Sequence, residues 1–193
     1  SYDTEWTAHF AKRLLKDDGV LVDNQNCMND AKIAEIVGYN RTVGCVMSSI
    51  TVGLWDPGIV DRGGKPGYES GHDVFRVGEL HGRVTKRVDE IVDLLSTIDG
   101  AKSTTNIWGE RWSKLTTNAS SNPITAMTGL GSNGAADITE ARRLQIEITT
   151  ETFQVGFAFN FDITPIKGIP VETWADAESG MVFTALEEVF LPN

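Results

Sequence analysis

Cysteine is scarce in this chain, with only Cys27 and Cys45 among 193 residues. Two thiols cannot form the several disulfide bonds that hold small secreted domains together, and a low cysteine content is typical of a reducing compartment. A nucleophilic cysteine needs a histidine partner, and the three histidines stand in no recognisable relation to either thiol. The sequence therefore excludes a disulfide scaffold, argues against thiol catalysis and predicts a cytoplasmic protein.

Metal-binding motifs and long apolar runs are also lacking. The sequence has no H-E-x-x-H motif and no Cys/His cluster at zinc-ligand spacing, so we expect no metal site. No apolar run approaches the roughly 18 residues that a membrane helix needs. Seventeen lysines and arginines stand against 27 acidic residues, and the net charge of −10 disfavours nucleic acid or an anionic membrane as a partner.

The residues that are present suit a packed interior. Hydrophobic residues make up 40% of the chain, which includes five tryptophans, and this composition argues against disorder. The first half alternates helical and strand patterns of apolar residues. We expect helices at residues 4–15, 30–37 and 84–98, and strands at 20–23, 43–55 (one long or two short) and 73–78.

Strand patterns fade after about Asn106. We expect helices at residues 107–121, 138–159 and 175–189, separated by turns that contain glycine or proline. The predicted fold class is therefore α/β followed by all-α. Such a layout is typical of two-domain dehydrogenases, and we expect a first domain at residues 1–106 and a second at 107–193. Ligand clefts often form between two such domains.

A run early in the second half combines one lysine with two carboxamides. Lys114, Asn118 and Asn122 follow one another at intervals of four, so a helix would project all three from one face. A positive charge among neutral hydrogen-bonding groups suits a substrate that develops negative charge on oxygen, as a carbonyl does when it is reduced. The alternative is a solvated surface ion pair with Glu110, four residues before the lysine. Pro123 is expected to end this helix or to begin the next.

Two glycine-rich stretches need separate interpretations. Residues 129–134 fit the string G-x-G-x-x-G, but no buried strand precedes them, so a helix–helix connection is favoured over a pyrophosphate loop. Asp137 to Glu140 is a candidate capping box for the next helix. Residues 62–67 are expected to form a flexible connection between strands, rather than a phosphate-binding loop.

Several of these segments, in this order, resemble the ketopantoate reductase (2-dehydropantoate 2-reductase) family. The run from Trp112 to Ala126 reads W-x-K-L-x-x-N-x-x-x-N-P-x-T-A, like the start of that family's C-terminal domain. Residues 19–26 resemble a late Rossmann strand that ends in Gln-Asn. Further similar segments are Val43-Gly44-Cys45, Pro57-Gly58-Ile59-Val60, Val77-Gly78-Glu79 and Ser132-Asn133-Gly134.

This resemblance implies a fold and a function. It implies a partial Rossmann-like, NADP-binding domain at residues 1–106 and a helical substrate and dimerisation domain of the 6-phosphogluconate-dehydrogenase-like type at 107–193. It implies NADPH-dependent reduction of a 2-keto acid, namely ketopantoate to pantoate, by a homodimer. Lys114 would be the catalytic general acid, and Asn26 would lie near the nicotinamide of NADPH. The residues that would bind substrate are Asn118, Asn122 and Asn133.

The chain departs from the family pattern in three places. The family reads Gln-Asn-Gly where this chain has Gln25-Asn26-Cys27, and cysteine lacks the freedom of glycine at positive φ. The family's N-terminal strand, Gly-rich turn and first helix are not recognised, and neither is its later C-terminal segment. The chain is therefore expected to correspond to the middle of a reductase.

Two alternatives to a ketopantoate reductase follow from these departures. One is a related reductase that acts on a different 2-keto acid. The other is a catalytically silent binding or assembly module with a dinucleotide-binding fold. The choice of NADPH over NADH depends on the resemblance alone.

Overall fold

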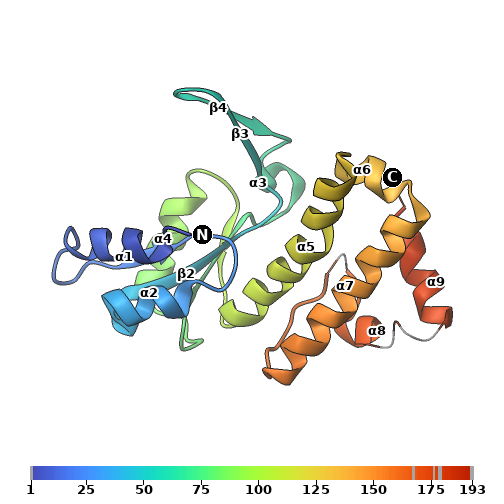
Figure 1. Ribbon diagram of the computed structural model, residues 1–193. Coiled ribbons are helices and arrows are strands. Elements are labelled where there is room, and N and C mark those ends of the chain that lie inside the picture. Colours follow the sequence, from blue (N-terminus) through green and yellow to red (C-terminus); the bar gives the residue numbers. More distant parts are fainter. Residues whose placement is uncertain (1, 167, 176, 178–179, 192–193) are drawn as a thin grey trace. The chain divides into compact units, whose positions relative to one another are not determined.

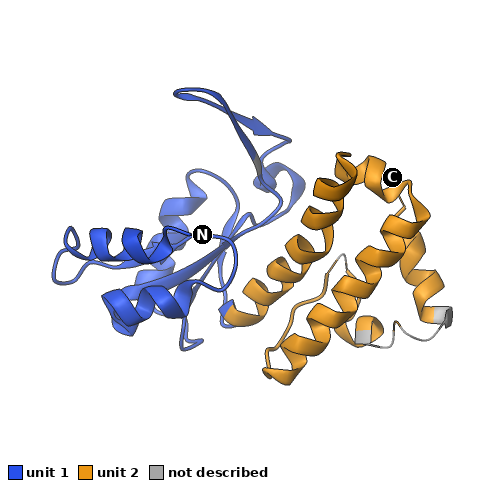
Figure 2. Ribbon diagram, in the orientation of Figure 1, with its two compact units in different colours: residues 1–107 blue, residues 108–193 orange. Residues whose placement is uncertain are grey.

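The chain forms two compact units in a computed structural model that describes residues 2–166, 168–175, 177 and 180–191. Unit 1 comprises Ser1–Ile107 and unit 2 comprises Trp108–Asn193 (Figure 2). Unit 1 contains strands and helices, whereas unit 2 is helical. The predicted fold class, an α/β part followed by an all-α part, is confirmed.

A four-stranded sheet forms the centre of unit 1, in the order β1-β2-β5-β6. The strands are β1 (Leu21–Asp23), β2 (Thr42–Met47), β5 (Phe75–Glu79) and β6 (Ala101–Ser103). β1 and β2 are parallel, as are β5 and β6, and the β2–β5 pair between them is antiparallel. α2 (Asp30–Val37) connects the first parallel pair and α4 (Lys86–Ser96) the second (Figure 1). Two β-α-β units thus share one sheet.

The core of unit 1 lies against β2 and β5. Val43, Cys45 and Val77 are completely buried there, and Val88 packs on them from α4. β-Branched residues favour strands, and strands buried on both faces carry apolar residues without alternation. Cys45 is therefore a small core residue, as its position in an apolar strand indicates.

A hairpin extends from this sheet as a separate two-stranded sheet (Figure 1). It consists of β3 (Thr51–Asp56) and β4 (Ile59–Gly63), joined at Pro57-Gly58. Gly58 has a φ of 80°, which glycine adopts without strain. The sequence left open whether residues 43–55 form one strand or two, and two are found, β2 and β3. The connection expected at residues 62–67 is shorter in the structure, because β4 includes residues 62 and 63 and the short helix α3 (Gly67–Ser70) begins at residue 67.

Two buried carboxylates join the elements of unit 1. Glu79, at the end of β5, accepts hydrogen bonds from Arg87 Nε at 2.7 Å and Nη2 at 2.6 Å, and from the Thr85 hydroxyl at 2.6 Å. Burial opposes ionisation of Glu79, but these bonds and the charge of Arg87 outweigh it, so the pKa lies below its ordinary value. Thr85 is also the N-cap of α4, and Glu79 therefore fixes the start of that helix.

Asp99 anchors the segment that follows the hairpin. It is buried and accepts hydrogen bonds from the backbone N–H groups of Gly67 at 2.6 Å and Gly100 at 2.7 Å, and it pairs with Arg62. Burial opposes ionisation of this carboxyl, yet the backbone donors and Arg62 hold its pKa below the ordinary value.

Unit 2 packs its helices around one aromatic core. The helices are α5 (Ile107–Thr128), which begins at the last residue of unit 1, α6 (Ser132–Ala136), α7 (Thr139–Ala158), α8 (Val171–Ala175) and α9 (Gly180–Val189). Ile146, Phe153 and Trp174 are fully buried between α7 and α8, and Leu186 joins them from α9. The helix expected at residues 175–189 is thus shorter, and part of that range lies outside the described residues.

Two expectations about helix ends in unit 2 are wrong. Pro123 lies inside α5, which continues to Thr128. Proline removes one backbone donor, and this helix tolerates the loss. Asp137 is not an N-cap, because its N–H closes α6 by bonding to the carbonyl of Asn133 at 3.1 Å. The N-cap of α7 is Ile138, which makes no side-chain cap bond, so the predicted capping box is absent.

Candidate functional site

The lysine and the two asparagines lie on one uninterrupted helix. Lys114, Asn118 and Asn122 all belong to α5, and because α5 runs past Pro123 the four-residue spacing places them along one face. Lys114 and Asn118 are half-buried and Asn122 is exposed. The row of an ammonium and two carboxamides therefore passes from a partly desolvated end to a solvated one.

The hydroxyl groups between these residues serve the helix itself. Thr116 and Thr117 donate to the carbonyls four residues back, of Trp112 at 2.9 Å and Ser113 at 3.1 Å. Such bonds are common for serine and threonine inside helices. Ser113 also contacts Thr164, whose hydroxyl donates to the Ser113 oxygen at 2.8 Å. These groups build α5 and its packing.

The apolar side of α5 fixes the helix within unit 2. Trp112 packs on Phe161, with ring centroids 5.0 Å apart, and its indole N–H donates to the carbonyl of Thr152 at 3.0 Å. The indole lies over Gly156 of α7, where a Cβ atom would come within 2.3 Å of the indole nitrogen. Glycine at this position lets α5 and α7 approach closely. Trp112 and Gly156 thus fix α5 against α7.

Asn133 lies beyond α5 in the same unit. It is exposed on α6, a single short helix that follows the glycines at 129 and 131. Its surroundings agree with the helix–helix connection expected for residues 129–134, since no strand precedes the glycines. The G-x-G-x-x-G string there is not a dinucleotide-binding turn.

Asn26 lies in unit 1, just after the carboxyl end of β1. The segment is shaped by its own polar side chains: Asp23 Oδ1 accepts from the N–H of Gln25 at 2.9 Å, and Asn29 donates to the carbonyl of Asn26 at 2.7 Å. The Thr4 hydroxyl of α1 (Thr4–Lys12) holds Gln25 at 2.6 Å. These bonds leave the Asn26 side chain exposed.

A cavity of about 310 Å³ lies beside this segment. Its lining includes residues 21–25, with Thr4 and Ala8 of α1 and Ile33 of α2. In open α/β sheets, ligands bind outside the carboxyl ends of the strands. Asn26 is not part of this lining but is the next residue along the chain, at the carboxyl end of β1.

Cys27 follows Asn26 with a φ of 73°. This is the left-handed region, which residues with a Cβ atom enter at a cost of roughly 1 kcal/mol. The cysteine thus keeps the backbone conformation that glycine would adopt freely, and it places an exposed thiol at that point. Cysteine in place of the family's glycine therefore changes the side chain at residue 27 but keeps the backbone conformation of a glycine turn.

Arg111 is a residue that the sequence analysis missed. It is only 3% exposed and lies three residues before Lys114, on an adjoining part of the α5 surface. A charged side chain this buried is normally paired. The sequence shows a second cation one turn before the lysine, but it does not show that this cation is buried.

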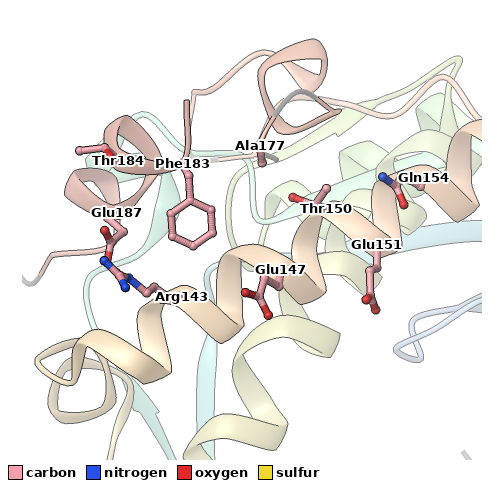
Figure 3. A pocket seen from close by; sticks show the side chains of 9 residues that line it. All are labelled: Arg143, Glu147, Thr150, Glu151, Gln154, Ala177, Phe183, Thr184 and Glu187. Atoms are coloured by element: carbon pink, nitrogen blue, oxygen red, sulfur yellow. The ribbon is translucent and has the colours of Figure 1, made fainter. Parts of the chain in front are cut away.

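A second cavity, of about 630 Å³, lies between α7 and α9 (Figure 3). Phe183 points from α9 toward α7, and Arg143 of α7 pairs with Glu187 of α9 at 3.1 Å. No predicted site residue lines this cavity. It therefore remains separate from the row on α5.

The structure contains neither a metal cluster nor a membrane-spanning helix among the residues it describes. No group of three or more His, Cys, Asp or Glu side chains there could hold a metal ion. No helix in the same ranges is long and apolar enough to cross a membrane.

Comparison with known proteins connects the α5 row to a family. Residues 106–181 match the family described as the C-terminal domain of ketopantoate reductase PanE/ApbA. This match contains the row from Lys114 to Asn122, and Asn133. The predicted resemblance to ketopantoate reductases is confirmed. None of the curated proteins compared with the chain matches it by sequence.

Solved structures share the fold at low sequence identity. D-mandelate dehydrogenase in complex with NADH aligns with a TM-score of 0.76 and 17% identity, over 100% of this chain and 57% of that one. The 2-dehydropantoate 2-reductase of Geobacter metallireducens GS-15 gives 0.74 and 19%, over 98% and 57%. A PanE/ApbA family ketopantoate reductase of Ralstonia eutropha JMP134 gives 0.70 and 15%, over 100% and 68%. The chain thus spans little more than half the length of the first two.

Proposed function

We propose that this chain is part of a nicotinamide-dependent reductase of 2-keto acids, acting on ketopantoate with NADPH to give pantoate. The observation that supports this most strongly is the row of Lys114, Asn118 and Asn122 on α5, within the segment that matches the ketopantoate reductase C-terminal domain. We further propose that the protein is a cytoplasmic homodimer.

The chemistry of the row suits reduction of a carbonyl. Addition of hydride to a 2-keto carbon leaves negative charge on the former carbonyl oxygen. In the proposed arrangement, the Lys114 ammonium hydrogen-bonds to that oxygen, stabilises the charge and donates the proton that completes the alcohol. The carboxamide of Asn118, one turn further along α5, holds the substrate beside the lysine.

The remaining asparagines would bind the rest of the substrate. Asn122 and Asn133 are exposed, so their carboxamides are available to the substrate's polar groups. Arg111 adds positive charge near Lys114, which favours a substrate that carries a carboxylate.

The residues after β1 fit a nicotinamide. When bound, NADPH supplies the hydride. The exposed carboxamide of Asn26 offers a donor and an acceptor, which match those of the nicotinamide carboxamide. Its place at the carboxyl end of β1 is where this class of fold binds cofactors. The glycine-like backbone of Cys27 keeps that turn in shape.

A second substrate class is favoured by one comparison. D-mandelate dehydrogenase, which aligns at a TM-score of 0.76 in a complex with NADH, has a 2-hydroxy acid for substrate. Oxidation of a 2-hydroxy acid is the reverse of the reaction proposed above. An aryl 2-keto acid with NADH is therefore the second candidate for this chain.

Consumption of reduced cofactor tests the proposal. The protein is offered NADPH or NADH with ketopantoate, phenylglyoxylate and a panel of other 2-keto acids, and binding of each cofactor is measured separately. We expect turnover that is fastest with ketopantoate and NADPH. Turnover with phenylglyoxylate and NADH would instead favour the second candidate. If the protein shows no turnover with any substrate and binds neither cofactor, the result would contradict a reductase and favour a silent binding module.

A further inference from the structure

Ser113, the residue before Lys114, bonds to a part of unit 2 outside its own helix. The other serine and threonine hydroxyls of α5 donate to oxygen atoms of α5 itself, as is usual for these residues inside helices. The Ser113 hydroxyl has two backbone carbonyl oxygens within reach, that of Gly109 in α5 at 3.0 Å and that of Thr164 at 2.8 Å. The Thr164 hydroxyl donates in return to the Ser113 oxygen at 2.8 Å. Hydrogen bonds in both directions therefore join Ser113 and Thr164.

The segment that carries Thr164 is fixed by contacts of its own. Phe161 packs on Trp112 of α5, and Ile163 is buried in the aromatic core of unit 2. These apolar contacts hold the segment on either side of its polar residues, independently of the bonds to Ser113. Thr164 therefore offers α5 a partner that is itself held in place, and the bonds between Thr164 and Ser113 restrain the helix.

Trp112 and Ser113 hold the same turn of α5 from two directions. The Trp112 indole N–H donates to the carbonyl of Thr152 in α7, whereas Ser113 bonds to Thr164. Successive residues project about 100° apart around a helix axis, so the two anchors together oppose both rotation and sliding of the turn. Lys114 is the next residue. Its ammonium stands on a flexible four-carbon stem, so the place of that ammonium depends on how firmly the backbone at the root of the stem is held.

We propose that Ser113 and Thr164 are positioning residues for the reductase reaction, which hold the turn of α5 from which Lys114 projects. This inference rests on the proposed function, because that function gives Lys114 its role. The two residues act through Lys114 and do not touch the substrate. A shift of about 1 Å in a reacting group can slow a reaction about 10²-fold. Lys114 acts mainly on the charge that develops in the transition state, so loss of the Ser113–Thr164 pair should lower kcat and change KM little.

Steady-state kinetics of Thr164 variants test the proposal, with ketopantoate and NADPH or, if the second candidate holds, with phenylglyoxylate and NADH. Thr164→Val removes the hydroxyl at nearly constant shape and should lower kcat at least about tenfold, with KM within about twofold of its original value. Thr164→Ser keeps the hydroxyl and should retain kcat. Thr150→Val is the matched control. It removes another buried threonine hydroxyl of unit 2, which donates to the carbonyl of Trp174 at 3.3 Å, and should leave kcat unchanged.

A double-mutant cycle tests whether the two residues act as one unit. Ser113→Ala removes the bonds in both directions, so it should lower kcat at least as much as Thr164→Val does. The double variant should then be no slower than Ser113→Ala alone, because the second substitution has no remaining bond to break. Losses of kcat that multiply in the double variant would show separate roles and contradict a positioning pair.

Amide hydrogen exchange tests the held turn without relying on turnover. In Thr164→Val, the backbone N–H groups of residues 112–117 should exchange at least about fivefold faster than in the unaltered protein, because local opening of α5 becomes easier. In Thr150→Val the same N–H groups should exchange at the original rate. Faster exchange confined to this turn of α5 would show that the Ser113–Thr164 pair holds it.

Several results would overturn the proposal. An unchanged kcat in Thr164→Val would do so, as would equal losses of kcat in Thr164→Val and Thr150→Val, because the effect would then reflect the packing of unit 2 in general. A Thr164→Ser variant as slow as Thr164→Val would show that the hydroxyl is not what matters. If the unaltered protein has no turnover, the proposed function fails, and hydrogen exchange alone decides whether the pair holds the turn. Unchanged exchange at residues 112–117 in Thr164→Val would then contradict the pair as well.

Discussion

At the scale of single residues, Cys27 shows how a substitution can preserve a turn. Its φ of 73° lies where glycine is at ease and cysteine is strained, and its exposed side chain makes little packing contribution. Cys27→Gly should therefore raise the free energy of unfolding by up to about 1 kcal/mol, since relief of strain outweighs the extra entropy of the unfolded chain. Urea denaturation measures this. Cys27→Ser keeps the strain and should change little; a Cys27→Gly chain less stable than the original would contradict the assignment.

At this scale, the sequence allowed predictions about residues whose role follows from their type and spacing. The order Lys114, Asn118, Asn122 predicts one helical face, and α5 provides it. Arg111 was missed because charge alone does not reveal burial, which depends on packing. The positive φ of Cys27 could not be read from the cysteine itself, because a strained backbone is imposed by the surrounding turn.

At the scale of elements, the contact of α5 with α7 depends on one glycine. A Cβ atom at residue 156 would lie 2.3 Å from the Trp112 indole nitrogen and 2.6 Å from a methyl carbon of Ile163. We expect Gly156→Ala to lower the free energy of unfolding by about 1–3 kcal/mol, because overpacking outweighs the better helix propensity of alanine. Gly134→Ala is the control: a Cβ atom there meets Leu130 at 3.5 Å, an ordinary contact, so the variant should be neutral or slightly more stable. Equal effects of the two substitutions in thermal unfolding would contradict this account.

Periodicity predicted most of the long helices, but it failed where neighbours decide. β6 was not anticipated, because Ala101, Lys102 and Ser103 carry no strand signal and pair with β5 through tertiary contact. Pro123 was expected to end or begin a helix, yet α5 continues through it. The capping box failed because the Asp137 N–H already closes α6. In each case a prediction from local sequence was wrong because contacts with neighbouring parts of the chain decided the structure.

At the scale of the whole molecule, buried carboxylates make stability depend on pH. The folded-state pKa of Glu79 lies below its ordinary value of 4.5, so its stabilising effect is complete above that pH. The effect is lost as the pH falls through the lower, folded-state pKa. Glu79→Gln should lower the free energy of unfolding by about 2 kcal/mol at neutral pH, because it leaves Arg87 without its carboxylate. Its effect should shrink in acid. Urea denaturation across the acid range measures this, and an equal effect at every pH would contradict it.

The same scale contains the central claim, that α5 carries the chemistry of a 2-keto acid reductase. The most direct test measures oxidation of NADPH and NADH with ketopantoate and phenylglyoxylate by the protein and by its Lys114→Ala variant. Lys86→Ala is the control, an exposed lysine on α4 that pairs with Glu90 at 3.4 Å. The account predicts that Lys114→Ala lowers kcat by about 10²–10⁴-fold with the fold intact, and that Lys86→Ala has no effect. Turnover by Lys114→Ala at the rate of the unaltered protein would contradict it.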